Sequence, residues 1–198
     1  MKFIVFDGID GCGKTTIARM IRDYLKKKNY KVFLTHEPNK NTKTGKKIKE
    51  LIRKNIMSKN FWKVLFTQAR IEHIEKIIKP KLDKNFIVIC DRYYYSTLAY
   101  QMNEKEWKGY LKKYNFIKPD VVFIFDVDTK IALERLEKRK RKKTVFEKYN
   151  FLEKTRKKFL ALYKRRHELK ENIFLIDGNQ PKLKVFSDVK KILDKFIE

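Results

Sequence analysis

Cysteine is scarce in this sequence, and long apolar runs are absent. The 198 residues include only Cys12 and Cys90, a pair without the spacing of metal ligands, which favours a reducing compartment. No apolar run approaches the roughly 18 residues that span a bilayer, and the chain enters its first apolar stretch without a signal-peptide pattern. We therefore expect a cytoplasmic protein with no membrane partner.

Acidic residues are few relative to basic ones. Asp and Glu number 24 against 50 Lys and Arg, which gives a formal net charge of +26. Such a charge attracts polyanions, but it does not distinguish a nucleotide from a nucleic acid or a membrane surface. The lysines are spread over the whole chain, so the charge by itself identifies no partner.

Linkers, repeats and low-complexity tracts are also missing, which predicts a single domain over residues 1–198. Short apolar runs predict buried strands at 2–7, 31–36, 86–91, 121–127 and 173–177. Helical periodicity marks the segments 14–28, 61–84, 129–141, 148–170 and 182–197. Because the strands are apolar throughout, both faces of their sheet are expected to be covered. The prediction is an α/β fold with a five-stranded parallel sheet flanked by helices.

Polar side chains gather at the carboxyl ends of these predicted strands, where open parallel sheets bind their ligands. The residues concerned are Asp7, His36, Glu37, Asp91, Asp126 and Asp128. We expect the ligand site at that edge of the sheet.

A glycine-dense stretch, GIDGCGKTT at residues 8–16, stands between the first predicted strand and the first predicted helix. It matches the pattern G-x-x-x-x-G-K-[ST], in which backbone N–H groups and a helix N-terminus surround phosphate oxygens. Lys14 is expected to reach the outer phosphates of ATP, and the Thr15 hydroxyl to ligate Mg²⁺. The expected nucleotide contacts are Gly8, Ile9, Asp10, Gly11, Cys12, Gly13, Lys14, Thr15 and Thr16.

The stretch LFTQARIEHIEKIIKPKL, residues 65–82, places Phe66 and Arg70 four apart and so on one helix face. An aromatic ring beside a guanidinium is suited to stacking a base and donating to its carbonyl. Residue type alone favours a plainer interpretation, with Phe66 in the core and Arg70 as a surface charge.

The stretch CDRYYYSTLAYQ, residues 90–101, ends a predicted strand and begins a helix near Ser96. Asp91, at the strand tip near the glycine loop, is suited to holding Mg²⁺, and Arg92 to clasping a phosphate. Tyr100 lies one turn after Ser96 and is core packing by default.

Over essentially its whole length the chain resembles the thymidylate kinase family of nucleoside-monophosphate kinases. The resemblance lies in DGIDGCGKTT, THEP, LFTQAR with IKP, DRYYYSTLAYQ, PDVVFIFDVD, FLEKTRKKFLALY and IDGNQP. It implies the three-layer sandwich of P-loop kinases and transfer of the γ-phosphate of ATP to dTMP, giving dTDP and ADP. It also implies a homodimer packed through helices, for which the segments 61–84 and 92–102 are candidates.

The resemblance implies roles for residues that would contact the sugar and phosphate of dTMP. Asp10 would bind the 3′-hydroxyl, and Arg92 would hold the acceptor phosphate. Tyr100 would crowd the 2′ position and so favour deoxyribose.

The resemblance also implies a base site. Phe66 would stack on thymine, Arg70 would donate to its O4, and Thr97 would make a polar contact to the base. The resemblance thus overturns the plainer interpretations of Phe66 and Tyr100 as core residues.

Three segments depart from the family's usual pattern. Where the family has Arg-Glu-Pro-Gly-Gly-Thr, this chain has HEPNKN at 36–41, so a phosphate contact there passes to His36, to Lys40 or to neither. Gly11 stands where some members have a loop arginine, which implies that the arginines come from the lid. The family's Arg-Phe-Glu at the lid end reads VFE at 145–147, without the arginine.

The run RLEKRKRKK at 135–143 has seven basic residues in nine. Such a cluster repels itself unless an anion arrives, and we predict a short basic lid, a lid insertion at about 139–150, that closes over the ATP phosphates. Arg135 and Arg139 share a helix face, and Arg141 continues into the lid. The candidate catalytic cations are Lys14, Arg92, Arg139 and Arg141, with Arg135 binding the nucleotide.

Three rival functions remain open on the sequence. A kinase for another nucleoside monophosphate differs only in the acceptor base. A nucleic-acid-binding ATPase is suggested by the net charge of +26, but the basic residues form no stripe interleaved with exposed aromatics. A nucleotide-dependent switch without catalysis does not account for Arg92, Tyr100 and the basic run together.

Overall fold

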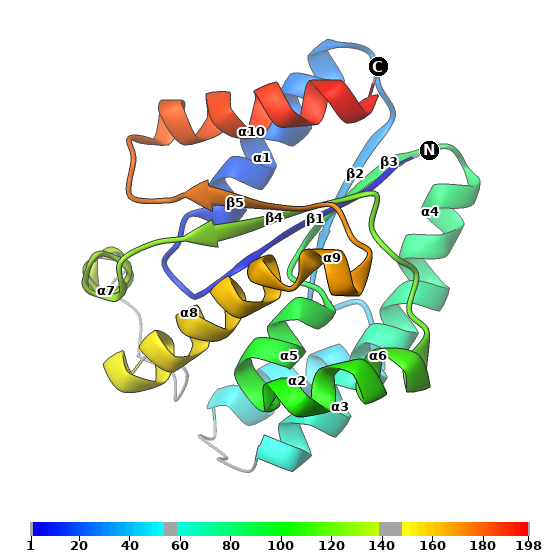
Figure 1. Ribbon diagram of the computed structural model, residues 1–198. Coiled ribbons are helices and arrows are strands. Elements are labelled where there is room, and N and C mark those ends of the chain that lie inside the picture. Colours follow the sequence, from blue (N-terminus) through cyan, green and yellow to red (C-terminus); the bar gives the residue numbers. More distant parts are fainter. Residues whose placement is uncertain (1, 54–58, 139–147, 198) are drawn as a thin grey trace.

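The computed structural model describes residues 2–53, 59–138 and 148–197 and has one sheet of five parallel strands (Figure 1). The strands are β1 (Lys2–Gly8), β2 (Val32–His36), β3 (Ile87–Asp91), β4 (Val121–Asp126) and β5 (Ile173–Asp177). Their order across the sheet is β2-β3-β1-β4-β5. The central strands β1, β3 and β4 are buried along nearly their whole length, as expected for apolar strands covered on both faces.

Helices cover both faces of the sheet and complete a three-layer α/β fold. They are α1 (Lys14–Lys27), α2 (Lys43–Arg53), α3 (Lys59–His73), α4 (Lys79–Asp83), α5 (Tyr94–Gln101), α6 (Trp107–Tyr114), α7 (Thr129–Glu137), α8 (Tyr149–Lys164), α9 (Arg166–Leu169) and α10 (Lys182–Ile197). In Figure 1, α1 and α10 pack on one face, and α4, α5 and α8 on the other. Helix α3 packs on α5, and α2 packs on α3, outside that second layer.

The predicted fold class and all five predicted strands are confirmed, with ends that differ by at most one residue. Two predicted helices are interrupted. The segment 148–170 divides into α8 and α9. The segment 61–84 divides because Pro80 has no N–H to donate to the carbonyl of residue 76, and a wider π-helical turn at Ile74–Ile78 separates α3 from α4.

Other helices differ from the sequence prediction. Helices α2 and α6, with a short 3-10 turn at Glu104–Glu106 before α6, were not predicted. Both are short and rich in lysine, but their apolar residues recur at helical spacing, as Ile48, Leu51 and Ile52 do in α2, and this signal was overlooked. Helix α5 begins at Tyr94 rather than near Ser96. Most of the predicted lid, 139–147, lies outside the described residues, and its end at 149–150 is the start of α8.

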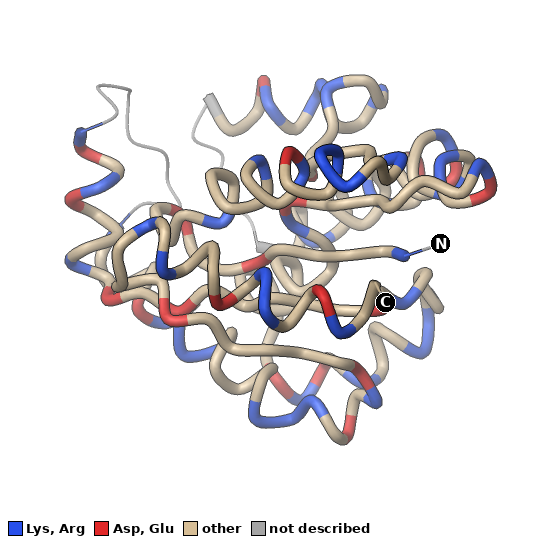
Figure 2. The backbone as a smooth tube through the Cα atoms, turned by 90° about the horizontal axis from the view of Figure 1, so that it is seen from above, with Lys and Arg blue, Asp and Glu red and all other residues tan. Residues whose placement is uncertain are grey.

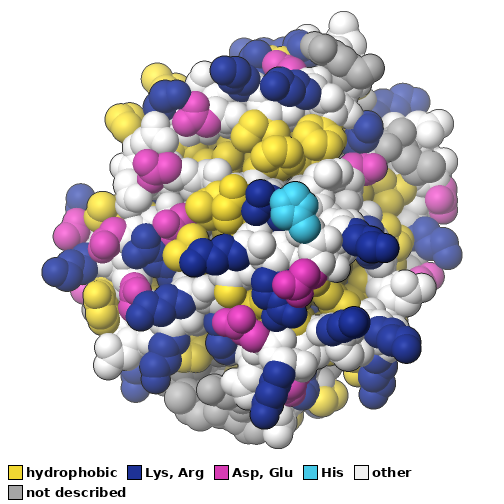
Figure 3. All heavy atoms as spheres, viewed as in Figure 1, with side chains coloured by type: hydrophobic (Ala, Val, Ile, Leu, Met, Phe, Trp, Pro, Cys, Tyr) yellow, Lys and Arg dark blue, Asp and Glu magenta, His cyan; other side chains and the backbone are white. Residues whose placement is uncertain are grey.

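Basic side chains are distributed around the molecule rather than gathered in one stripe. Figure 2 shows Lys and Arg on helices of both layers. On the face in Figure 3 they alternate with acidic side chains, and hydrophobic side chains form a band along the sheet edge at β5, where Leu175 is 36% exposed. None of the described helices is long and apolar enough to cross a bilayer.

Helix α2 is fixed against the loop that follows β2. Thr42 donates its hydroxyl to the carbonyl of Asn39 (2.9 Å) and accepts from the N–H of Gly45 (3.1 Å). A Cβ atom at Gly45 would overlap the carbonyl oxygen of Asn39. The helix therefore approaches the loop as closely as only glycine permits.

We expect Gly45→Ala to lower the free energy of unfolding by about 1–3 kcal/mol, because the added methyl group forces α2 away from the loop. Gly109→Ala is the matched control, since a Cβ there meets nothing within 4 Å and alanine favours a helix by about 1 kcal/mol. Urea denaturation of both variants measures the difference. A Gly45→Ala protein as stable as the parent would contradict this account of the contact.

Candidate active site

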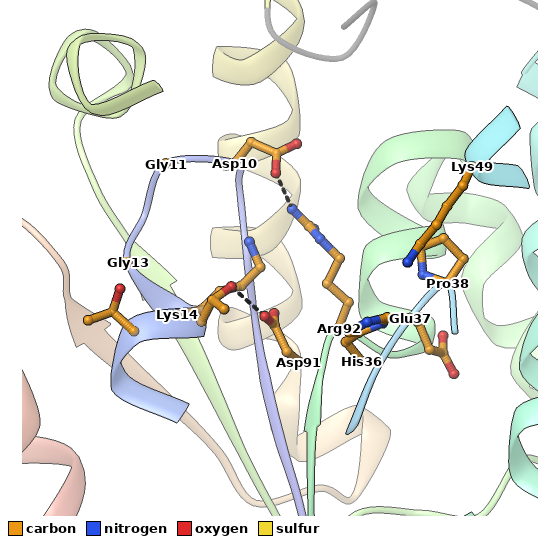
Figure 4. Close-up of a pocket in the computed structure, with 12 residues that line it drawn as sticks. Asp10, Gly11, Gly13, Lys14, His36, Glu37, Pro38, Lys49, Asp91 and Arg92 are labelled. Carbon is orange, nitrogen blue, oxygen red and sulfur yellow. Dashed lines mark hydrogen bonds and ion pairs between the residues drawn. The ribbon is translucent and has the colours of Figure 1, made fainter. Parts of the chain in front are cut away.

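A cavity of about 300 Å³ opens at the carboxyl ends of β1, β2 and β3. One wall is the glycine loop with the start of α1, and the other comes from β2, β3 and α2 (Figure 4). The first wall contributes Asp10, Gly11, Gly13, Lys14, Thr15 and Thr16. The second contributes His36, Glu37, Pro38, Lys49, Asp91 and Arg92. The cavity therefore lies at the edge of the sheet that the strand-end residues predicted.

The glycine loop presents backbone to this cavity because its larger side chains turn inward. Ile9 and Cys12 are 1% and 2% exposed and belong to the core, so their side chains are not available to a ligand. Gly11 has φ +85°, and a Cβ there would overlap the carbonyl of Ala132. The Lys14 amine donates to the carbonyl of Ile9 (3.2 Å) and so lies back over the loop.

The two predicted metal ligands lie side by side. The Thr15 hydroxyl donates to one carboxylate oxygen of Asp91. The other oxygen, Oδ1, is buried and has no hydrogen-bond partner in the part of the chain that the structure describes. A buried carboxylate oxygen without a donor is costly unless a cation approaches it, and hydroxyl and carboxylate oxygens are the ligands that Mg²⁺ prefers. These two residues therefore fit a magnesium ion.

Arg92 stands at the end of β3 in a left-handed conformation, φ +74°, which a non-glycine residue adopts only where its surroundings enforce it. Its guanidinium donates to Asp10 (2.8 Å), to the carbonyl of Gly8 (3.1 Å) and to the Ser96 hydroxyl (2.9 Å). Although burial opposes the charge, Asp10, with Tyr100 and other acidic groups, raises the pKa of Arg92 well above its usual value. The cation is permanent and faces the glycine loop.

Asp7, near the end of β1, holds the turn between β3 and α5 in place. Its carboxylate is 0% exposed and accepts from the N–H of Tyr93 (3.1 Å), the N–H of Ser96 (3.0 Å) and the Ser96 hydroxyl (2.7 Å). Burial raises the pKa of Asp7, and Arg92, 3.7 Å away, is the largest opposing influence. Ser96 thus connects Asp7 to Arg92. The sequence had indicated only that a helix begins near Ser96, not that its hydroxyl makes this connection.

Tyr100 belongs both to the core and to this cluster. The side chain is 7% exposed and packs on Phe151 and Phe159, as the default interpretation predicted. Its hydroxyl also accepts from the N–H of Asp10 (3.2 Å), and the Arg92 guanidinium lies 5.4 Å from its ring. The structure therefore brings Asp10, Arg92 and Tyr100 together, as the family resemblance implied.

Arg70 is buried, and its interpretation as a surface charge is wrong. It is 1% exposed and forms an ion pair with Glu37 at 2.8 Å. It also donates to the carbonyl of Tyr93 (3.0 Å), the Thr97 hydroxyl (3.1 Å) and the Tyr110 hydroxyl (3.3 Å). Arg70 and Thr97 are thus neighbours, as the resemblance implied.

Phe66 lies one turn before Arg70 on α3 and is half-buried. It packs on Trp62, with ring centroids 5.8 Å apart, in a small cluster that includes Ile48 of α2. Phe66 is not among the residues of the 300 Å³ cavity, so its stacking on a base stays a prediction.

A second cavity of about 280 Å³ lies behind the glycine loop. It runs from Gly11 and Gly13 to Arg135, Gly178 and Gln180. Arg135 is held by a hydrogen bond to the carbonyl of Gly178 (2.9 Å) and so faces the loop, as expected of a nucleotide contact.

Arg139 and Arg141 lie outside the described residues, as does the departure at 145–147. Of the polar residues at the end of β4, Asp126 forms an ion pair with Arg156 (2.6 Å), and Asp128 caps α7 by accepting from the N–H of Lys130. These two contribute to the fold rather than to the described cavities.

The departure at 36–41 is accommodated without glycine. Neither Asn39 nor Lys40 has a positive φ, and the Asn39 amide is buried and donates to Thr35 (2.9 Å). His36 lines the cavity, whereas Lys40 is exposed and does not. Lys49 also lines it; sequence reasoning missed this residue because α2 itself was not predicted.

Three buried groups, Glu37, His73 and Cys90, place ligand atoms within 4.8 Å of one another. The Arg70 guanidinium already neutralises Glu37, and burial raises the pKa of the Cys90 thiol well above its usual value. A thiol must lose its proton to bind a metal. This cluster is therefore unsuited to a cation.

Comparison with known proteins gives a consistent result. A family model described as thymidylate kinase matches residues 6–189. The thymidylate kinase of Thermosipho africanus is 37% identical over 204 aligned residues, which cover 99% of both chains. That of Thermosipho melanesiensis is 34% identical, again over 99% of both. The probable thymidylate kinase of Methanococcus maripaludis is 40% identical over 81% of this chain and 77% of that protein.

We expect Ser96→Ala to lower the free energy of unfolding by about 1–3 kcal/mol, because the buried Asp7 carboxylate loses a donor that it cannot replace with water. Ser187→Ala, the same substitution at an exposed position of α10, should leave stability unchanged. Thermal unfolding of the two variants in parallel makes the comparison. Equal stability of both would show that Asp7 does not depend on Ser96.

Proposed function

The chain belongs to the thymidylate kinase family, and we propose that its cavity transfers the γ-phosphate of ATP to dTMP, giving dTDP and ADP. The observation that carries this proposal is the placement of Lys14 and the glycine loop opposite Arg92, whose guanidinium donates across the cavity to Asp10 of the loop (Figure 4). One wall suits a triphosphate, and the other a second, phosphate-bearing nucleotide.

For the donor, we propose that the backbone of residues 8–16 and the start of α1 bind the ATP phosphates. Gly13 is the N-cap of α1 and supplies no side-chain cap, so the first N–H groups of the helix are available to an anion. The second cavity, with Arg135, would then take the rest of ATP. Arg139 and Arg141 stay predictions as lid cations.

Thr15 and Asp91 would hold Mg²⁺. A bound magnesium ion neutralises charge on the donor phosphates. The unpartnered Oδ1 of Asp91 supports this assignment. The side chains themselves do the orienting, since Thr15 belongs to α1 and Asp91 to β3, and their hydrogen bond fixes the distance between the two walls.

For the acceptor, Arg92 would bind the phosphate of dTMP, with Lys49 as the second cation on that wall. Lys49 thereby stands in for the arginine that the family has at position 36. His36 is a poor substitute, because partial burial and the nearby Lys49 lower its pKa and so favour the neutral imidazole. Asp10 would move its bond from Arg92 toward the sugar hydroxyl.

The chemistry requires alignment and neutralisation more than proton transfer. An oxygen of the acceptor phosphate forms a bond to the γ-phosphorus while the bond from that phosphorus to the β-γ bridging oxygen breaks, and ADP leaves with the electron pair. The acceptor oxygen is already anionic at neutral pH. Lys14, Arg92 and Lys49 surround the reacting groups and offset the repulsion between the two nucleotides.

A homodimer and a cytoplasmic location are also proposed. Helix α3 carries the exposed apolar side chains Phe61, Val64 and Ile71, of which Val64 is 64% exposed, and such a surface suits a partner helix. The other candidate segment, 92–102, is mostly buried within the chain and offers less to a partner.

Purified protein with ATP and Mg²⁺ should phosphorylate dTMP in preference to dUMP, dGMP and UMP, as measured by coupled detection of ADP. Lys14→Ala should lower turnover by at least about a hundredfold, because a charge that stabilises the transition state is lost. Lys26→Ala, an exposed lysine at the far end of α1, is the matched control. If the protein forms no dTDP, or prefers another acceptor, the proposed function is wrong.

Tyr100→Ala should narrow the preference for dTMP over its ribose analogue by about tenfold or more, because removal of the ring opens space for a 2′-hydroxyl. Tyr100→Phe keeps the ring and should keep the preference. The ratio of the two kcat/KM values within each variant is the measurement, which cancels any loss of folded protein. An unchanged ratio in Tyr100→Ala would remove Tyr100 from sugar discrimination.

A further inference from the structure

A continuous chain of buried polar side chains connects the loop after β2 to Arg70. Asn39 donates to the Thr35 hydroxyl (2.9 Å), which lies 2.7 Å from Nε2 of His73. Nδ1 of His73 lies 3.3 Å from Glu37, and Glu37 accepts from Nε of Arg70 (2.8 Å). All five side chains are at most 8% exposed. We refer to these residues as the buried polar chain.

The donors and acceptors of this chain agree in only one neutral form of His73. Asn39 uses the Thr35 oxygen as an acceptor, so the Thr35 hydroxyl is free to donate its own proton to Nε2 of His73. Nδ1 then carries the ring proton and donates to the Glu37 carboxylate, which Arg70 also approaches as a donor. Each hydrogen bond in the buried polar chain is then donated in the direction of Glu37. Each of the polar groups in these hydrogen bonds has a partner.

The consequence falls on Arg70. Its guanidinium has five N–H groups, and four hydrogen bonds, to Glu37, Tyr93, Thr97 and Tyr110, occupy four of them. Two aromatic rings, of Tyr93 and Phe116, also cover it at 5.5 and 5.4 Å. An arginine held on so many sides has little freedom to turn, and it presents only donors.

A fixed donor discriminates between bases. A carbonyl oxygen accepts from it, whereas the exocyclic amino group of cytosine would place donor against donor in a buried site. A guanidinium that could swing away from the base would lose part of this discrimination, because the amino group would no longer face a fixed donor. The residues that hold Arg70 in place therefore contribute to base selection without touching the base.

We propose that His73 is a positioning residue for base recognition: through its Nδ1 proton it orients Glu37, and Glu37 fixes the Arg70 guanidinium so that a base carbonyl is accepted and a base amino group is rejected. The proposal rests on the proposed function, because it assumes that Arg70 contacts the acceptor base. His73 itself does not touch the base in this proposal; it acts on Arg70 through Glu37.

The test uses three substitutions that separate the two ring nitrogens. His73→Asn keeps an amide N–H near the position of Nδ1, His73→Gln keeps one near Nε2, and His73→Ala keeps neither. For each variant, kcat/KM is measured for dTMP and for dCMP, together with KM for ATP and the melting temperature. Dissociation constants of both monophosphates, by calorimetry, give the same ratio without turnover.

We expect His73→Asn to retain the dTMP-to-dCMP ratio of the parent within about threefold. His73→Gln and His73→Ala should lower that ratio about tenfold or more, in keeping with the loss of one buried charge-assisted hydrogen bond. KM for ATP should not change. Glu37→Gln, which keeps an acceptor for Arg70 but removes the charge, should fall between the parent and His73→Ala.

Three results would overturn the proposal. The first is an unchanged ratio in His73→Gln and His73→Ala. The second is a ratio in His73→Asn as low as in His73→Ala. The third is a parallel loss of dTMP, dCMP and ATP affinity with a lower melting temperature, which is the signature of a structural role. Failure of the proposed function would be seen in the parent protein rather than in the variants. The parent would then form no dTDP, or it would bind dTMP and dCMP equally well.

Discussion

The ion pairs of Arg92 with Asp10 and Asp7 are the interactions on which the rest of the site depends. Arg92 adopts a left-handed conformation that costs on the order of 1–3 kcal/mol, and it does so because Asp7 receives the N–H groups of the following turn. The same turn starts α5, which carries Thr97 and Tyr100. One buried carboxylate at the end of β1 therefore determines where Arg92, Thr97 and Tyr100 lie.

This arrangement also explains how Arg92 and Arg70 are accommodated largely or wholly out of contact with water. Isolated buried charges are very costly, so each cation needs a partner at all times. Arg92 has Asp10 and Arg70 has Glu37. The two pairs have different fates in our proposal. Asp10 is 29% exposed and can give up Arg92 to an incoming phosphate, whereas Glu37 is 6% exposed and stays with Arg70 throughout. Exchangeable and permanent partners thus separate phosphate binding from base reading.

The sequence was sufficient for features that depend on local pattern. Continuous apolar runs identified the strands, the glycine spacing identified the loop with Lys14 and Thr15, and the end of a predicted strand identified Asp91. Sequence reasoning failed where burial depends on distant segments. Arg70 looks like a surface charge because its neutralising partner, Glu37, is 33 residues away. Lys49 was missed because α2 was not predicted, although Ile48, Leu51 and Ile52 recur at helical spacing. The position of this helix beside the cavity depends on Ile48 packing on Trp62 and on Thr44 bonding to Glu72, contacts with a distant segment that local sequence does not reveal.

The net charge of +26 is not what makes the cavity selective. Among the described residues that line it, Lys14, Lys49 and Arg92 are offset in part by Asp10 and Asp91, while Glu37 is paired with Arg70. The excess lysines lie mainly on the outer helices (Figure 2), and beyond about 8 Å their field is screened at physiological salt. They raise the local concentration of any anion alike. Selection between one nucleotide and another has to come from groups that are fixed and desolvated, and in this chain those groups are the buried pairs, each of which holds a donor at a set position before a substrate arrives.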